Sequence, residues 1–212
     1  MEVKKALKAV LFDLDETLLK LPIQYDELRR RLREHASRFN LNYDFHHILD
    51  DVEKASQILG EKFRKECYEI IEQYECQAAQ KPIAEKDMKT TLEKLKKAGL
   101  KIGIISRNSR KAVALALQKT GTLKLIDIII GREDTPKTKP HPDPIIKALE
   151  KLGIKPSEAI YVGDHPYDQA AATAANTTFI AIGNKIKSNK TPHIKHINEI
   201  TKLTINTQRQ NH

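Results

Sequence analysis

Short apolar segments alternate with amphipathic helical segments along most of this chain of 212 residues. The apolar segments are rich in Val, Ile and Leu, a composition typical of strands buried on both faces of a parallel sheet. They lie at residues 7–12, 101–105, 126–130, 159–162 and 178–182. Apolar residues spaced three and four apart between them predict helices that cover the sheet. We therefore predict an α/β fold built on a parallel sheet.

The alternation stops between about Lys20 and Ala84, where we find no strand-like run. A first helical face is formed by Leu28, Leu32, Ala36 and Phe39. A second, longer helix is indicated by apolar residues at helical spacing within 58–74. A proline lies near each end of the segment, and proline commonly marks such boundaries. We predict an all-α domain at 21–82, inserted into an α/β core domain formed by 1–20 and 83–212. A short strand or helix is expected within 193–203.

Four of the predicted strands are followed by polar residues. In open parallel sheets, ligands bind at the carboxyl ends of the strands, so residues at these positions are candidates for one shared site. In chain order they are Asp13 and Asp15, then Ser106 with Arg107 and Asn108, then Lys139, and finally Asp164 with Asp168.

The residue types at these positions suit a site for a metal ion and a phosphoryl group. Two carboxylates as close as Asp13 and Asp15 repel each other and are costly to desolvate unless a cation compensates them. Mg²⁺ prefers oxygen ligands and usually takes one or two carboxylates, with water and substrate phosphate completing its shell. The hydroxyl of Ser106 and nearby backbone amides can bind an anion. Lys139 can neutralise charge that develops on a transferring group.

Each of these elements has a commoner explanation when it occurs alone. An Asp-x-Asp sequence is often a turn or a helix cap, a Ser-Arg-Asn triplet is usually a helix N-cap, and a Lys-Pro pair is usually a loop. Their order, and their placement at or just beyond the ends of separate predicted strands, favours a common site.

Together the four motifs resemble those of the haloacid dehalogenase (HAD) superfamily of aspartate-dependent hydrolases, over about residues 7–182. The matching stretches are Asp13-Leu14-Asp15-Glu16-Thr17-Leu18, Ser106, Lys139, and Gly163-Asp164-x-x-x-Asp168. The inserted helices are similar to the helical type of cap domain in this family. The stretches at 106–108 and 139–143 look most like the phosphoglycolate-phosphatase-like branch. The resemblance implies a Rossmann-like, HAD-like core with an inserted all-α cap.

The resemblance also implies a role for each acid. Asp13 would attack phosphorus and bind Mg²⁺. Asp15 would act first as general acid and then as base, with its backbone carbonyl on the metal. Asp164 would bind Mg²⁺ directly, and Asp168 directly or through water.

The remaining motif residues would hold the phosphoryl group. The resemblance implies that Ser106 donates a hydrogen bond to this group and that Lys139 steadies both the group and Asp13. Arg107 and Asn108 could also contact the phosphate through an amide or a side chain. For Arg107, a solvent-facing salt bridge is an equal alternative.

The implied function is a Mg²⁺-dependent phosphatase that hydrolyses a small phosphomonoester through an aspartyl-phosphate. Its partner would be a small phosphorylated metabolite, phosphoglycolate-like or a sugar phosphate. A phosphoryl transferase or phosphomutase would use the same residues and is a first alternative. The substrate depends on which cap side chains face the site. The candidates are Tyr25, Arg29, Tyr43, Arg64 and Tyr68.

A net charge of +9 raises a second alternative, a nucleic-acid-binding module or a phosphatase acting on nucleic-acid ends. The segment 20–81, however, carries eleven Lys and Arg against twelve Asp and Glu. The chain also has no Trp and only 5% aromatic residues, so stacking platforms for bases are sparse. These features argue against nucleic acid as the partner.

The remaining features indicate a cytoplasmic protein. Cys67 and Cys76 form no CxxC pair, and we expect reduced thiols with no metal role. No stretch approaches the roughly 20 apolar residues that span a bilayer, and no small-residue cleavage site follows the N-terminal apolar run. The pair His46 and His47, between the predicted cap helices, is expected at the surface.

Overall fold

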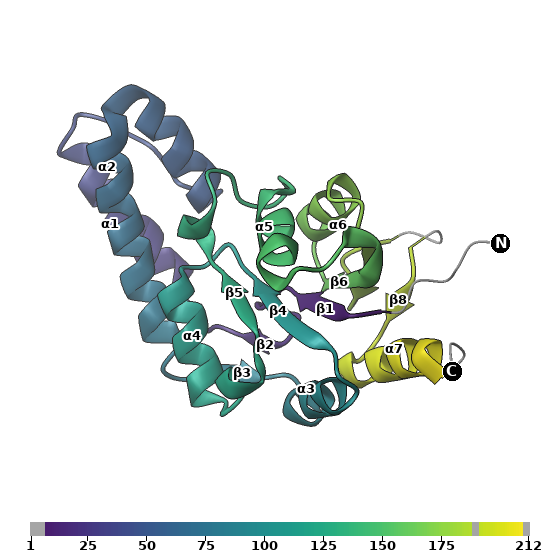
Figure 1. The fold of residues 1–212 in the computed structure, drawn as a ribbon. Coiled ribbons are helices and arrows are strands. Elements are labelled where there is room, and N and C mark those ends of the chain that lie inside the picture. The colour runs from purple at the N-terminus through teal and green to yellow at the C-terminus, as the bar shows by residue number, and fades with distance from the viewer. Residues whose placement is uncertain (1–6, 188–190, 210–212) are drawn as a thin grey trace.

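The computed structural model describes residues 7–187 and 191–209, and within them the predicted α/β fold is confirmed. Six parallel strands form one sheet in the order β5-β4-β1-β6-β7-β8 (Figure 1). The strands are β1 (Ala9–Phe12), β4 (Lys101–Ile105), β5 (Ile128–Ile130), β6 (Ala159–Gly163), β7 (Thr178–Ile182) and β8 (His193–Ile194). From β1 the chain adds β4 and β5 on one side of the sheet and β6, β7 and β8 on the other. In doubly wound sheets of this kind, ligands bind in the crevice where the strand order reverses.

Helices cover both faces of the sheet (Figure 1). One face carries α3 (Met88–Lys97), α4 (Arg110–Lys119) and α7 (Ile200–Arg209), and the other carries α5 (Asp143–Leu152) and α6 (Pro166–Ala174). Four 3-10 turns connect these elements: η1 (Leu123–Leu125), η2 (Arg132–Asp134), η3 (Pro156–Glu158) and η4 (Ile197–Glu199). The element expected within 193–203 is present as both β8 and the start of α7.

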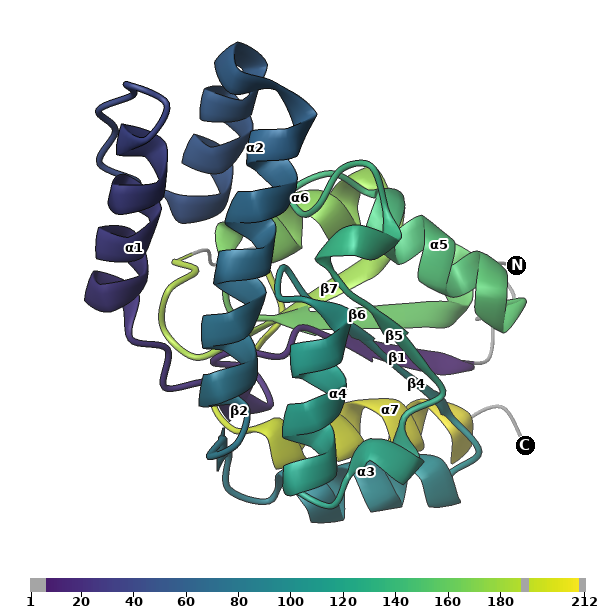
Figure 2. The same ribbon diagram turned by 90° about the vertical axis from the view of Figure 1, so that its left-hand side faces the viewer.

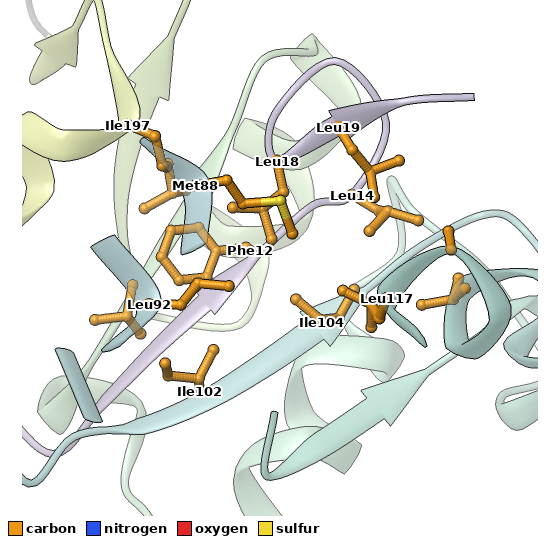
Figure 3. Packing of buried hydrophobic residues seen from close by; sticks show 14 of the residues in the cluster. Phe12, Leu14, Leu18, Leu19, Met88, Leu92, Ile102, Ile104, Leu117 and Ile197 are labelled. Carbon is orange, nitrogen blue, oxygen red and sulfur yellow. The ribbon is translucent and has the colours of Figure 1, made fainter. Parts of the chain in front are cut away.

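The central strand β1 is buried on both faces, as its continuous apolar sequence predicts. Val10 and Phe12 pack into the cluster under α3 and α4, whereas Ala9 and Leu11 pack into the cluster under α5. Figure 3 shows Phe12 among side chains from α3, β4 and the loop after β1. Each large apolar side chain buried in this way contributes about 1.5–3 kcal/mol. Burial therefore fixes β1, and with it the position of the residues that follow.

The cap predicted at residues 21–82 contains two helices, α1 (Tyr25–Ser37) and α2 (Ile48–Ala78). Two short antiparallel strands, β2 (Leu19–Lys20) and β3 (Ile83–Ala84), pair where the chain leaves and re-enters the core, although the sequence predicts no strand between about Lys20 and Ala84. Each has only two residues, too few to show a strand pattern in the sequence. The cap has a hydrophobic cluster of its own, which includes Leu28, Leu32, Phe45, Phe63 and Cys67. Figure 2 shows α1 and α2 side by side at one edge of the core.

Helix α2 differs from the single long helix that the sequence predicts, because it begins ten residues earlier, at Ile48, and reverses at Gly60. Gly60 has φ 84° and ψ 179°, a conformation that is essentially restricted to glycine. The two halves lie back to back, since Glu53 accepts hydrogen bonds from Arg64 Nε at 2.9 Å and from Tyr68. The reversal returns the first turn of α2 to the core.

A Gly60→Ala variant is expected to lose about 1–3 kcal/mol of stability, because a side chain at this backbone conformation is strained. A Cβ atom would meet nothing within 4 Å, so the loss would come from the backbone alone. Chemical denaturation measures it, with Gln57→Ala on the same exposed surface as the control. Equal stability of Gly60→Ala and the wild type would mean that the reversal is not fixed at this residue.

The location predicted from the sequence depends on membrane spans and on the state of the two cysteines. Among residues 7–187 and 191–209, no helix is long and apolar enough to cross a bilayer. Cys67 is buried and Cys76 half-buried, and both are free thiols, as the sequence predicts.

Candidate active site

A cavity of about 500 Å³ lies between the cap and the carboxyl ends of β1, β4 and β6. Every site residue predicted from the sequence lines it. These are Asp13, Asp15, Ser106, Arg107, Asn108, Lys139, Asp164 and Asp168. The structure therefore brings together residues that are up to 155 positions apart in the chain.

Asp13 extends strand β1 by one residue, since its backbone N–H donates to Val162 O at 2.9 Å. Its side chain is only about a tenth exposed. Asp15 follows in the turn that leads to the cap, and its Oδ1 accepts a hydrogen bond from Leu21 N at 2.8 Å. The first two acids are thus positioned by the sheet and by the entry to the cap.

Lys139 is the buried cation of the site. Its Nζ donates hydrogen bonds to Asp13 Oδ1 and Asp168 Oδ1, both at 2.6 Å, and to Tyr161 Oη at 3.0 Å. Burial disfavours its charged form, but the two carboxylates outweigh burial and raise the pKa of Lys139. Charge-assisted hydrogen bonds of this length are strong and hold the three side chains in one arrangement.

Burial raises the pKa of Asp13 to about 7, although Lys139 opposes the effect, and repulsion from Asp168 and Asp164 adds to it. The buried carboxylates of Asp13, Asp164 and Asp168 each offer an oxygen, and these oxygens lie within 4.8 Å of one another. One buried lysine therefore leaves this cluster with more negative charge than it can hold at neutral pH. The oxygen donors and the charge deficit fit a divalent cation.

Asp168 depends on a glycine for its place. It is about 1% exposed, and its Oδ2 accepts a hydrogen bond from His165 N at 3.0 Å. A Cβ atom on Gly163 would lie 2.6 Å from Cβ, Cγ and Oδ2 of Asp168. The close approach explains why glycine precedes Asp164 in this motif, because any side chain there would displace the acid.

Ser106 begins the loop between β4 and α4. Its N–H continues the sheet by donating to Ile130 O at 3.0 Å, and its Oγ accepts a hydrogen bond from Asn108 N at 3.1 Å. Because Oγ accepts that bond, the hydroxyl proton remains available to a ligand in the cavity. Ser109 then caps α4 through Ala112 N.

Arg107 pairs with the cap. Its Nη2 lies 2.6 Å from Asp50 Oδ1, and its guanidinium lies over the ring of Tyr167 at 5.0 Å. Tyr167 Oη also reaches Asp50 Oδ2 at 3.5 Å. The salt bridge that was one alternative for Arg107 is present, but it crosses the cavity between cap and core, with the Arg107 side chain three-quarters buried.

The structure also shows which of the candidate cap residues face the cavity. Tyr25 and Arg29 line the cavity, whereas Arg64 and Tyr68 bind Glu53 within the cap. Tyr43 packs against the ring of Phe45 at 5.3 Å. His46 and His47 are exposed, as predicted, but they also line the cavity.

Sequence reasoning missed several residues at the site. Lys185 Nζ binds Asp164 Oδ2 at 2.7 Å and also pairs with Glu16. Lys185 follows β7, so the rule applied to the other four strand ends would have found it. Tyr161 gives no such signal, since its ring lies within an apolar strand and only its hydroxyl reaches the site.

Asp15 is expected to make the metal-free protein less stable as pH rises. Burial raises its pKa from 3.8 to about 6, against the hydrogen bond from Leu21. Between these values the folded protein binds more protons than the unfolded chain, so stability falls with increasing pH in that window. Asn mimics the protonated acid, and Asp15→Asn should therefore be more stable than the wild type at pH 7 by up to about 3 kcal/mol.

Denaturant unfolding in EDTA across this pH range measures the difference between the two proteins. The difference should disappear as the pH falls below about 4, because Asp15 is then protonated in both the folded and the unfolded protein. Asp26→Asn, at an exposed position on α1, is the control. A difference that does not change with pH would contradict the prediction.

Known proteins are similar to this chain over most of its length. The family model of the haloacid dehalogenase-like hydrolases matches residues 10–182. The pyrophosphatase PpaX of Bacillus mycoides is 29% identical over 197 residues, which cover 85% of this chain and 86% of that protein. A HAD phosphatase from Thermococcus onnurineus has a similar structure, with TM-score 0.66, 28% identity, and coverage of 93% of this chain and 97% of the other.

A β-phosphoglucomutase from Clostridium difficile shares the fold, with a TM-score of 0.73 at 17% identity, over 96% of this chain and 98% of the other. The matched region contains all four motifs, and the matched structures span the core and the helical cap. The chain therefore belongs to the haloacid dehalogenase-like hydrolase family.

Proposed function

We propose that this hydrolase is a Mg²⁺-dependent phosphatase that acts on small phosphomonoesters through a phosphorylated Asp13. The observation that carries the proposal is the arrangement around Asp13. A buried carboxylate stands at the end of the central strand, 2.6 Å from a buried lysine, and two further buried acids lie beside it. A carboxylate nucleophile divides the hydrolysis into two easier steps.

In the first step an oxygen of Asp13 attacks phosphorus. Since Lys139 engages Oδ1, we expect Oδ2 to form the new bond. The bond from phosphorus to the leaving oxygen breaks, and Asp15 donates its proton to that oxygen. A pKa of about 6 leaves part of the Asp15 population protonated near neutral pH, as a general acid requires.

In the second step Asp15, now ionised, removes a proton from water, and the water oxygen attacks phosphorus. The bond to Asp13 breaks, which releases inorganic phosphate and restores the carboxylate. Lys139 balances the charge of Asp13 in both steps, and the free proton of the Ser106 hydroxyl is directed to a phosphoryl oxygen. Each step therefore uses a group that already lines the cavity.

Asp13, Asp164 and Asp168 are the residues that would hold Mg²⁺, with the backbone carbonyl of Asp15. When bound, the ion would neutralise phosphoryl oxygens and the surplus negative charge of the cluster. The two free thiols are compatible with a reducing compartment, and the cytoplasm is the location we propose.

Two substrate classes are candidates. The motif loops resemble the phosphoglycolate-phosphatase-like branch, which favours a small organic phosphomonoester. The curated PpaX relatives are named as pyrophosphatases, which favours inorganic pyrophosphate. Both fit a cavity of about 500 Å³ that carries Arg29, Arg107 and two histidines from the cap.

Phosphate release from an aryl phosphate, phosphoglycolate, sugar phosphates and pyrophosphate, with Mg²⁺ and with EDTA, tests the proposal. We expect release that requires Mg²⁺ and is fastest with one of these classes. Transfer of the phosphoryl group to a second position of a sugar phosphate, without free phosphate, would instead identify a mutase. No release and no transfer with any member of the panel would count against the proposed function.

A further inference from the structure

A buried ion pair connects the cap to the core at the wall of the cavity, which Glu75 lines. Glu75, near the end of α2, is 2% exposed, and Arg132, just after β5, is 7% exposed. Arg132 Nη1 lies 2.6 Å from Glu75 Oε1, and Nη2 lies 3.3 Å from Oε2. The guanidinium also lies over the ring of Tyr68 of the cap at 4.8 Å. Two charges of opposite sign are thus removed from water at the junction of two structural units.

This pair binds the backbone of the loop after β4 at three successive residues. Ser109 N donates to Glu75 Oε2 at 2.9 Å. Arg107 O accepts from Arg132 Nη1 at 3.0 Å, and Asn108 O accepts from Arg132 N at 2.9 Å. The loop therefore has three successive backbone groups fixed by this pair, of which Glu75 also lines the cavity.

The same loop presents the groups that we expect to hold the phosphoryl group. Asn108 N binds Ser106 Oγ, so the position of Asn108 sets the orientation of the hydroxyl. The first turn of α2 also contacts the loop, through the ion pair between Asp50 and Arg107. One cap helix thus contacts residues 106–109 at both of its ends, because it reverses at Gly60.

Buried ion pairs contribute little net stability compared with apolar packing, so stability alone does not account for this one. Its geometry has a more specific consequence. Since Glu75 belongs to the cap and Arg132 to the core, the hydrogen bonds at residues 107–109 are complete only when the base of α2 is docked.

We propose that Glu75 and Arg132 are positioning residues that hold the loop 106–109 in its phosphate-binding form and make that form depend on docking of the cap. The proposal rests on the proposed function, because it assigns the loop to the phosphoryl group. Neither residue takes part in bond making. Their effect reaches the substrate through Ser106 and the backbone of Asn108.

The test compares Glu75→Ala, Glu75→Gln and the double variant Glu75→Gln/Arg132→Met with the wild type. Gln keeps an oxygen for Ser109 N, and it should therefore restore part of what Ala loses. The double variant removes both buried charges, so its stability should recover relative to Glu75→Ala. It still lacks the hydrogen bond from the Arg132 side chain to Arg107 O. The double variant therefore distinguishes a loss of stability from a displacement of the loop.

Glu72→Ala is the matched control. Glu72 lies one turn before Glu75 on α2 and also pairs with the core, at Lys111 Nζ of α4 (3.1 Å), but on the exposed surface. Losing this pair should leave stability nearly unchanged and phosphate binding unchanged.

The main readout is the affinity for inorganic phosphate in Mg²⁺, measured by titration calorimetry, with kcat and KM measured where the protein turns over. We expect about 10- to 100-fold weaker phosphate binding in Glu75→Ala and in the double variant, and a lower kcat, with the loss in the double variant persisting after its stability recovers. Wild-type phosphate affinity in the double variant would overturn the proposal and leave the pair a purely structural contact.

The activity assay and the phosphate titration test the proposed function and the positioning role separately. A wild type that hydrolyses no phosphate ester would overturn the proposed function, while the titration with inorganic phosphate would still report on the loop. If Glu75→Ala does not fold, the double variant and Glu75→Gln carry the comparison. Equal phosphate affinity in all variants that fold would overturn the positioning role whatever the result of the activity assay.

Discussion

Asp13→Asn is expected to lower phosphate release by about four orders of magnitude or more, because the amide cannot attack phosphorus. The variant should nevertheless fold. Burial raises the pKa of Asp13 to about 7, so the neutral amide resembles a protonated form that the metal-free site already populates near neutral pH. The measurement is the rate of phosphate release at saturating substrate and Mg²⁺, with unfolding curves for both proteins.

Glu93→Gln makes the same carboxylate-to-amide change at an exposed position of α3, away from the cavity, and should leave the rate unchanged. Residual activity of Asp13→Asn within tenfold of the wild type would exclude a phosphorylated Asp13. Loss of activity together with loss of folding would be a different result, and the unfolding curves identify it. Trapping of radiolabelled phosphate on the wild type, but not on Asp13→Asn, would add direct evidence for the intermediate.

Lys139→Met is expected to destabilise the metal-free protein by about 3–5 kcal/mol, because it leaves buried carboxylates without their cation. Lys139 is 4% exposed and binds Asp13 and Asp168 at 2.6 Å each. Methionine preserves much of the apolar length of the side chain, so the loss should come mainly from charge and hydrogen bonds. Denaturant unfolding in EDTA measures it.

Mg²⁺ should return part of this stability, since a divalent ion supplies positive charge to the same acids. The rescue should be larger for Lys139→Met than for Lys151→Met, a change at an exposed lysine of α5. A loss below about 1 kcal/mol in EDTA would mean that the lysine contributes no more than a surface pair does. Absence of any stabilisation by Mg²⁺ in every protein would argue against a metal site at these acids.

The sheet and the residues at its edge were predictable because they depend on local patterns. A short apolar strand followed by a polar turn specifies where its own last side chains lie, and parallel strands bring those ends to one edge. Asp13, Ser106 and Asp164 are examples, since each immediately follows its strand. Lys185 obeys the same rule, since it lies just beyond the end of β7.

The contacts between the cap and the core could not be predicted from the local sequence. Glu75 lies in an amphipathic helix among other acids, and nothing in the sequence around it distinguishes it from the half-buried Glu72. Only the packing of the cap on the core shows that its partner is Arg132, 57 residues away. Gly60 is a similar case, because an isolated glycine within a helical pattern can be tolerated or can reverse the chain, and tertiary contacts decide between them.

The pairing of β2 with β3 has a consequence for how such a chain can change over time. The two points where the cap joins the core are hydrogen-bonded neighbours, with Leu19 opposite Ala84 and Lys20 opposite Ile83. An insertion between adjacent points closes its loop without displacing the flanking chain, and loop-closure cost grows only slowly with the length inserted. The predicted cap, residues 21–82, can therefore be lengthened, shortened or exchanged without displacing the flanking strands. An exchange that keeps a carboxylate at the place of Glu75 would alter the substrate while the loop 106–109 keeps its geometry.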